Sequence, residues 1–94
     1  MKIIKIGAIW CPGCLVMKKV WKNIVVDNPN LDIIELDLDM DSQEVNKYNP
    51  GKVLPVCIFF DDNGNELERL IGEQKESVIR EKINKFGGNN EEDK

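Results

Sequence analysis

Two cysteines separated by two residues, Cys11 and Cys14, carry the clearest chemical signal in this sequence. An apolar run, residues 3–9, leads into them, and a helical pattern, residues 15–26, follows, so the pair is predicted at a strand-to-helix junction. The unpaired backbone N–H groups and the dipole at the start of a helix stabilise a thiolate. The short spacing lets the second thiol close a small disulfide ring. The pattern therefore predicts a dithiol redox site.

The two residues between the cysteines suit such a site. Pro12 fits the first turn of a helix, because the N–H group that proline lacks would be unpaired there in any case. Gly13 has no side chain, so it leaves the approach to the sulfur atoms open.

Metal binding is the main alternative use of this spacing. A structural zinc ion usually takes four Cys or His ligands. The sequence has no histidine and only one further cysteine, Cys57, which leaves a three-thiolate site completed by a carboxylate or water. A purely structural disulfide is disfavoured, because so short a loop constrains little of the unfolded chain. The alternating carboxylates Glu35, Asp37 and Asp39 could bind a divalent cation, but such a row is more typical of a solvated strand face.

Length and composition limit the classes of protein. The chain of 94 residues makes one domain, and 41% apolar with 32% charged residues is typical of a soluble globular protein. A net charge of −4 argues against nucleic-acid and anionic-membrane partners. The first apolar run is broken by Lys5 and leads directly into the cysteine motif, so it is predicted to be a strand and not a signal peptide. The odd number of cysteines suits a reducing compartment, so a cytoplasmic location is expected.

The first half of the chain alternates strand and helix patterns. Residues 2–9 are apolar on both faces, which is typical of an interior strand. Residues 31–39 alternate between apolar and acidic and predict a second strand. The spacing of Asp41 and Glu44 is that of a capping box, which predicts a short helix to about Tyr48. The helix between the two strands carries an apolar stripe that should lie on the sheet, formed by Met17, Val20, Trp21 and Ile24.

The second half begins with an apolar run, residues 53–60, that contains Pro55. Proline cannot donate to a sheet ladder, so a strand that starts at Pro55 is favoured. The Asn63-Gly64 pair predicts a hairpin turn to a further strand, residues 67–71. A last helix is expected from residue 73 to Gly87 and Gly88, and its inward side chains are Val78, Ile79, Ile83 and Phe86.

The predicted fold class follows from the order β-α-β-α-β-β-α. Both β-α-β steps are expected to be parallel with right-handed crossovers, and the hairpin adds an antiparallel strand. This predicts an α/β domain over residues 1–88, with a four-stranded mixed sheet and helices on both faces. Residues 89–94 are predicted to form a flexible polar tail.

These features, in this order, resemble the thioredoxin superfamily, and the resemblance covers residues 2–86. It rests on Trp10 and the Cys-x-x-Cys motif after the first strand, on Leu54-Pro55 before the third, and on Gly72 before the last helix. It implies a thioredoxin-like fold in which the proline matching Pro55 is cis and faces the disulfide. It also implies a groove where the backbone of Leu54 pairs with an extended substrate segment, with Trp10, Pro12, Gly13, Leu54, Pro55 and Gly72 as substrate-binding residues.

The resemblance implies a thiol–disulfide oxidoreductase, here a cytoplasmic protein-disulfide reductase. An exposed Cys11 would attack a substrate disulfide, and a more buried Cys14 would resolve the mixed disulfide. The electrons reside in the Cys11–Cys14 dithiol, so no bound cofactor is expected. The expected partners are disulfide-containing proteins and a thioredoxin-reductase-like or small-thiol electron donor, and a monomer is expected. Two alternatives are a redox-sensing binding module without turnover and a metal-binding protein that uses Cys11, Cys14 and Cys57.

The sequence departs from a typical thioredoxin at several places. It has no counterpart of that protein's first strand and helix, and its central dipeptide is Pro-Gly instead of Gly-Pro. Lys5 stands where thioredoxin has a buried aspartate, and Glu35 lies near the position of a lysine on the next strand. The pair is therefore predicted to be exchanged, with the Glu35 carboxylate beneath the sulfur atoms. The alternative is that Lys5 reaches the surface and Glu35 is solvated.

Cys57 follows Pro55 by two residues and is expected on the same side of the strand. It is interpreted as a buried, inert thiol that packs as a small apolar side chain. The alternative is a third redox thiol beneath the Cys11–Cys14 pair.

Overall fold

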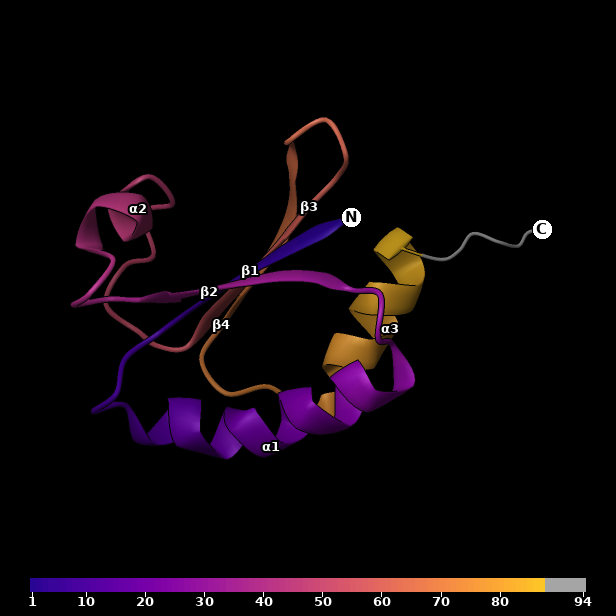
Figure 1. Ribbon diagram of the computed structural model, residues 1–94, viewed down its shortest axis with the longest axis horizontal. Helices are drawn as coiled ribbons and strands as arrows, with labels where there is room; N and C mark the ends of the chain where they lie inside the picture. Colours follow the sequence, from indigo (N-terminus) through magenta and orange to yellow (C-terminus); the bar gives the residue numbers. More distant parts are fainter. Residues whose placement is uncertain (88–94) are drawn as a thin grey trace.

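Four strands form one mixed sheet with helices on both faces in the computed structural model, which describes residues 1–87 (Figure 1). The predicted element order and fold class are confirmed. Gly88 and the predicted tail, residues 89–94, lie outside the described residues. In chain order the elements are β1 (Lys2–Gly7), α1 (Pro12–Asp27), β2 (Asp32–Asp37), α2 (Ser42–Asn46), β3 (Val56–Phe60), β4 (Glu66–Ile71) and α3 (Glu76–Gly87).

The strands lie in the order β2-β1-β3-β4. β1 is parallel to β2, whereas β3 is antiparallel to both β1 and β4. The second β-α-β step was expected to be parallel, and this prediction is wrong. Residues 38–55 are long enough for a crossover, but the only helix among them, α2, has five residues and is too short to span the sheet as a crossover helix does. The segment after α2 instead returns to the end where β1 finishes, so that Val56 starts β3 opposite Ile6.

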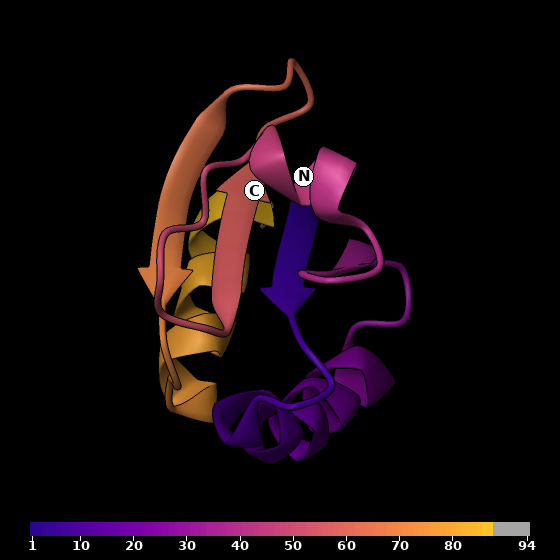
Figure 2. The same ribbon diagram turned by 90° about the vertical axis from the view of Figure 1, so that its left-hand side faces the viewer.

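Two apolar clusters lie on opposite faces of the sheet. Figures 1 and 2 show α1 and α3 on one side and the short α2 on the other. β1 contributes to both clusters, which explains why it is apolar on both faces. Toward α1 and α3 the buried residues are Ile3, Met17, Trp21, Ile24, Cys57, Phe59, Ile79 and Ile83. Toward α2 they are Ile4, Ile6, Val45, Val56 and Ile58.

The first strand is shorter than predicted. It ends at Gly7, and Ile9 is 82% exposed in the turn that follows. The Cys11 amide donates to the Ala8 carbonyl over 3.1 Å, so the chain has left the strand before Ile9. The turn places the cysteine motif just beyond the end of the sheet.

The expected capping box is not formed. Asp41 is the N-cap of α2 but makes no side-chain capping hydrogen bond. Its carboxylate instead accepts a hydrogen bond from the Asp37 amide over 2.9 Å, at the end of β2. The acidic residue therefore closes the turn between β2 and α2.

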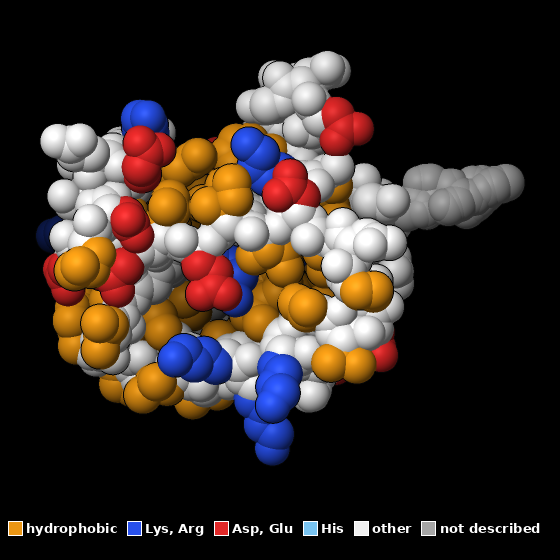
Figure 3. Space-filling view, in the orientation of Figure 1, with side chains coloured by type: hydrophobic (Ala, Val, Ile, Leu, Met, Phe, Trp, Pro, Cys, Tyr) orange, Lys and Arg blue, Asp and Glu red, His pale blue; other side chains and the backbone are white. Residues whose placement is uncertain are grey.

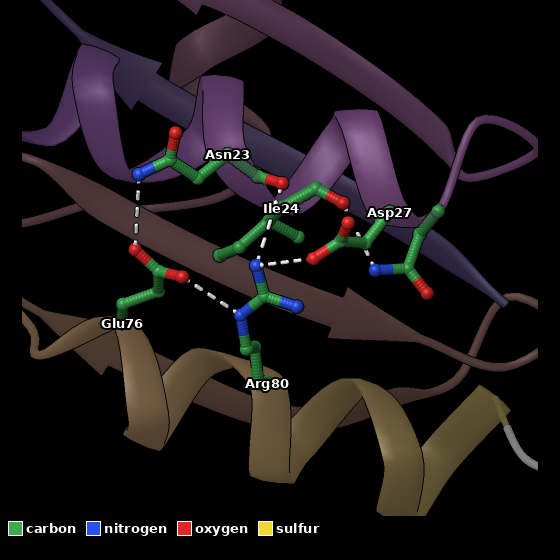
Figure 4. A network of polar contacts seen from close by, with 6 residues as sticks. Asn23, Ile24, Asp27, Glu76 and Arg80 are labelled. Carbon is green, nitrogen blue, oxygen red and sulfur yellow. Dashed lines mark hydrogen bonds and ion pairs between the residues drawn. The ribbon is translucent and has the colours of Figure 1, made fainter.

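Helices α1 and α3 are joined by a polar network around Arg80 (Figure 4). The Arg80 guanidinium lies 2.7 Å from an Asp27 oxygen and 2.8 Å from a Glu76 oxygen. Asn23 donates to the other Glu76 oxygen over 3.3 Å. These contacts fix the two helices against each other on the face that carries the cysteine motif.

No helix within residues 1–87 has the length and apolarity needed to cross a membrane.

Candidate active site

Cys11 is the N-cap residue of α1, at the junction that the sequence predicts. Its Sγ accepts a hydrogen bond from the Cys14 amide over 3.2 Å, and Pro12 occupies the first turn. No acidic residue lies in that turn to oppose a negative charge. All three cysteines are free thiols. An amide donor and the positive end of a helix therefore meet at the Cys11 sulfur and stabilise its thiolate.

The relative exposure of the two cysteines is the reverse of the expectation. Cys11 is only 4% exposed, whereas Cys14 is half-buried. The reason is local: the Cys11 sulfur turns back onto the first turn of the helix to reach the Cys14 amide, while Cys14 lines a cavity that opens to solvent. Exposure alone therefore does not identify the attacking thiol.

The surroundings of each sulfur distinguish the two thiols more clearly than exposure does. Burial raises the pKa of Cys14 to about 11, and its hydrogen bond to Cys11 adds to this shift. A thiol with such a pKa stays protonated at neutral pH and can donate to its neighbour. Cys11 is consequently the better nucleophile of the pair, and Cys14 is the resolving thiol.

The position of Cys14 favours glycine at the end of β1. A Cβ atom at residue 7 would lie 3.0 Å from the Cys14 sulfur, tighter than most such contacts, so a larger residue there would push the sulfur aside. The sulfur therefore sits directly over the backbone of Gly7. This glycine was not predicted as a site residue, although a glycine that ends an apolar strand before a reactive motif is a signal that the sequence offers.

The predicted second half of the site lies beside the cysteine motif. The Leu54–Pro55 peptide bond is cis. Pro55 accepts a hydrogen bond from the Gly72 amide over 2.8 Å, and Gly72 has a φ of 85°, which favours glycine. The Pro55 ring lies 3.4 Å from the point that a Cβ on Gly13 would occupy. The structure thus brings the predicted groove residues together at one end of the sheet.

Trp10 is 61% exposed at the rim of this groove. Its indole Nε1 donates to a carboxylate oxygen of Asp39 over 2.7 Å, which fixes the ring against the turn after β2. From the sequence, Asp39 was interpreted only as part of a solvated acidic face. Its contact with Trp10 depends on how the two loops meet, which the alternating pattern does not reveal.

Glu73 is a further residue at the groove that was not predicted from the sequence. Its Cγ and one carboxylate oxygen each lie 3.1 Å from the point that a Cβ on Gly13 would occupy. A negative charge therefore borders the groove beside Pro55. The signal available in the sequence was its place directly after Gly72.

A cavity of about 360 Å³ lies behind the cysteine motif, between the sheet and α1. Figure 3 shows this face hollowed, with hydrophobic side chains inside and charged ones at the opening. A volume of this size is large enough to hold several water molecules. The lining includes two thiols, an indole ring and charged groups, namely Cys14, Cys57, Trp21, Lys5, Glu35 and Asp37.

Lys5 and Glu35 form the pair that the sequence predicts. The Lys5 ammonium lies 3.3 Å from a Glu35 oxygen and 4.8 Å from the centre of the Trp21 ring. The Lys5 side chain is 20% exposed and that of Glu35 is 75% exposed. Lys5 thus stays inside the cavity, whereas Glu35 lies at its opening. That Glu35 acts on the sulfur atoms stays a prediction.

Cys57 lies opposite Lys5 on the neighbouring strand β3 and is 8% exposed. Burial raises the pKa of its thiol to about 12, although the charge of Lys5 opposes this shift. Within residues 1–87 no three His, Cys, Asp or Glu side chains are grouped so that they could hold a metal ion. Cys57 is therefore a protonated, buried thiol in this structure.

Comparison with known proteins identifies the family. The sequence profile described as Thioredoxin matches residues 1–85, nearly the whole chain. The chain belongs to the thioredoxin family. Membership supports thiol–disulfide oxidoreductase activity in general, and Cys11 and Cys14 have the spacing of the family's dithiol site.

Individual thioredoxins agree with this assignment. The thioredoxin of Ophiophagus hannah is 29% identical over 84 residues, which cover 89% of this chain and 77% of that protein. The structure of Fasciola hepatica thioredoxin matches with a TM-score of 0.79 at 24% identity, over 90% of this chain and 79% of that one. Plasmodium falciparum thioredoxin matches with a TM-score of 0.76 at 21% identity, over 89% and 83%. The two structural matches show the thioredoxin fold.

Proposed function

We propose that this thioredoxin-family chain is a cytoplasmic protein-disulfide reductase that works through its Cys11–Cys14 dithiol. The observation that carries the proposal is the asymmetry of the two thiols. The Cys11 sulfur accepts an amide hydrogen bond at a helix N-terminus, while the pKa of Cys14 is raised to about 11 by burial. Such a pair can attack a disulfide with one sulfur and then resolve the mixed disulfide with the second, which stays protonated until that step.

The reaction has two steps. The Cys11 thiolate attacks one sulfur of a substrate disulfide, so a mixed disulfide forms and the first substrate thiolate leaves. Cys14 then loses its proton and attacks the Cys11 sulfur, which releases the second substrate thiolate. The substrate disulfide gains two electrons, and the dithiol loses two as it becomes the Cys11–Cys14 disulfide. The chemistry needs no bound cofactor.

An apolar rim around the groove supports a protein substrate. Ile9 and Trp10 are exposed directly before Cys11, and Val53 and Ile71 are exposed next to Gly72. Val53 contacts the region of Gly72, 3.7 Å from the point that a Cβ there would occupy. An extended substrate segment that pairs with the backbone of Leu54 would cover these side chains.

The Glu73 carboxylate predicts a charge preference among substrates. Replacing it in a Glu73→Gln variant is expected to lower kcat/KM about threefold for a disulfide peptide with lysines beside its cysteines, because an attraction of about 0.7 kcal/mol at the rim is lost. A matched peptide with glutamates in place of the lysines should be reduced faster by the variant than by the wild type. An equal change for both peptides would contradict the preference.

The odd number of cysteines supports a reducing compartment, and hence the proposed cytoplasmic location. Each turnover leaves a disulfide, so the proposal requires an electron donor, either a thioredoxin-reductase-like protein or a small thiol. We propose that the chain acts as a monomer.

The equilibrium reduction potential of the pair, measured in a Cys57→Ser background, tests the proposed function. A value near about −270 mV would agree with a reductase, whereas a value between about −120 and −180 mV would indicate an oxidant or isomerase. If no Cys11–Cys14 disulfide forms, the proposal is wrong. Partner binding that survives in a Cys11→Ser/Cys14→Ser double variant would then favour the redox-sensing binding module.

A further inference from the structure

The register of β1 and β2 places one carboxylate at the level of the Cys14 sulfur. Gly7 and Asp37 are direct partners in this parallel pair, two positions after Lys5 and Glu35. Paired residues of neighbouring strands project to the same face of a sheet, and every second residue shares that face. The Lys5–Glu35 contact lines the cavity toward α1, so Asp37 faces the same cavity. Since the Cys14 sulfur sits over Gly7, Asp37 stands beside it on the adjacent strand.

Glu35 is less well placed for the same task. It lies two residues earlier along β2, roughly 7 Å from the level of Gly7 at about 3.3 Å per residue. Its carboxylate is also held by the Lys5 ammonium at 3.3 Å, at the exposed opening of the cavity. The acid nearest to the Cys14 sulfur along the strand is thus Asp37.

The Asp37 carboxylate is held in place by the backbone. One of its oxygens, Oδ1, accepts hydrogen bonds from the amides of Asp39 and Met40, each over 2.9 Å. The Asp37 amide in turn donates to Asp41. The carboxylate is therefore fixed at the cavity wall, and its second oxygen has no protein hydrogen-bond donor among the contacts of the described residues.

We propose that Asp37 accepts the proton of Cys14, through water in the cavity, when Cys14 resolves the mixed disulfide. This inference rests on the proposed reductase function. The Cys14 S–H bond breaks and its proton passes to the Asp37 carboxylate. The Cys14 sulfur bonds to the Cys11 sulfur, and the bond between Cys11 and the substrate breaks, so that the substrate leaves as a thiolate. The proton then leaves Asp37 for solvent through the open cavity.

The resting state of Cys14 makes such an acceptor useful. At a pKa of about 11 only about one Cys14 in ten thousand is a thiolate at pH 7. The charge of Asp37 itself contributes to raising that pKa, in addition to burial and Cys11. The other titratable groups around the cavity are Lys18 from α1, Lys5 from β1, Glu35 and Asp41 from β2 and its following turn, and Cys57 from β3.

The test uses an aromatic disulfide, dithiobis(nitrobenzoate), whose thiolate product is coloured. After rapid mixing with the reduced protein, the first coloured equivalent reports attack by Cys11 and the second reports attack by Cys14. An Asp37→Asn variant keeps the Oδ1 acceptor for the two amides but cannot take a proton. We expect its second phase to be about 100-fold slower at pH 7 and its first phase to change less than about threefold. The two proteins should converge toward pH 11, where Cys14 ionises unaided.

A purely electrostatic role for Asp37 predicts the opposite sign. Removing a negative charge would lower the pKa of Cys14, so the second phase of Asp37→Asn would become faster. A second phase that is equal or faster at pH 7 therefore overturns the inference. Asp32→Asn removes a carboxylate from the same strand, far from the cavity, and should leave both phases unchanged. A slow second phase in Glu35→Gln with a normal one in Asp37→Asn would assign the role to Glu35 and overturn the inference as well.

The unmodified protein provides a test that needs no variant. With Asp37 as the acceptor, the second phase should change less than about threefold between pH 6 and pH 8. Without an acceptor, the rate of the second phase should rise about tenfold per pH unit, as the thiolate fraction of Cys14 does. That result would overturn the inference even if Asp37→Asn does not fold. Release of only one equivalent of the coloured thiolate would mean that Cys14 does not resolve the mixed disulfide, which contradicts the proposed reductase function itself. A failure of that function can thus be distinguished from a failure of the inference about Asp37.

Discussion

A Cys14→Ser variant should accumulate a stable mixed disulfide with protein substrates, while a Cys11→Ser variant should lose turnover by a factor on the order of 10³ or more. The first change leaves the Cys11 sulfur at the helix N-terminus but removes the thiol that releases the substrate. The second removes the sulfur that accepts the Cys14 amide hydrogen bond. A serine hydroxyl cannot replace either thiol in disulfide exchange.

Insulin reduction under steady-state conditions measures turnover, and electrophoresis without reductant followed by mass spectrometry detects the trapped species. A Cys57→Ser variant is the matched control, because it removes the one thiol outside the pair. It should turn over normally and should accumulate no mixed disulfide. If Cys14→Ser captured nothing while Cys11→Ser captured substrate through Cys14, the assigned roles would be reversed. The low exposure of Cys11 makes this a real test, since exposure by itself would favour Cys14.

The sequence was sufficient for the elements and for the thiol pair, because both depend on local pattern. Strand and helix periods identify which segments form each element, and the Cys-x-x-Cys spacing can be recognised without knowing the fold. The antiparallel direction of β3 could not be predicted from the sequence, because it depends on the path of the irregular segment between α2 and Pro55. The same limit explains why Cys11 was expected to be exposed. Its burial results from the orientation of its side chain, which points toward the Cys14 amide.

The acidic residues of β2 show why site residues beyond the motif were missed. Glu35, Asp37 and Asp39 look equivalent as alternate residues of one strand. The structure gives them different neighbours, namely Lys5, the Gly7–Cys14 contact and the Trp10 indole. Those neighbours come from β1 and from the loop before α1, so register and loop geometry decide them. The Lys5–Glu35 pair was predicted only because a family resemblance supplied the register.

Cys57 should make the protein less stable in alkali, and Cys57→Ala should remove that effect. Burial raises the pKa of the folded thiol from its ordinary value of 9.0 to about 12. Above pH 9 the unfolded chain loses this proton while the folded chain keeps it, so ionisation favours unfolding. The stability is complete below pH 9 and falls until the pH passes about 12. By pH 11 the loss is about 3 kcal/mol, at about 1.4 kcal/mol per pH unit.

Urea unfolding of the reduced protein at pH 8 and pH 11, at one ionic strength, measures this loss. The wild type and Cys57→Ala share every other titrating group, Cys14 included, so the difference between them isolates Cys57. The wild type should lose about 3 kcal/mol more than Cys57→Ala between the two pH values, a large part of the ~5–14 kcal/mol expected for a domain of this size. Equal losses would mean that the Cys57 thiol ionises in the folded protein. It would then be a nucleophile beside Lys5, and the interpretation as a third redox thiol would replace that of an inert one.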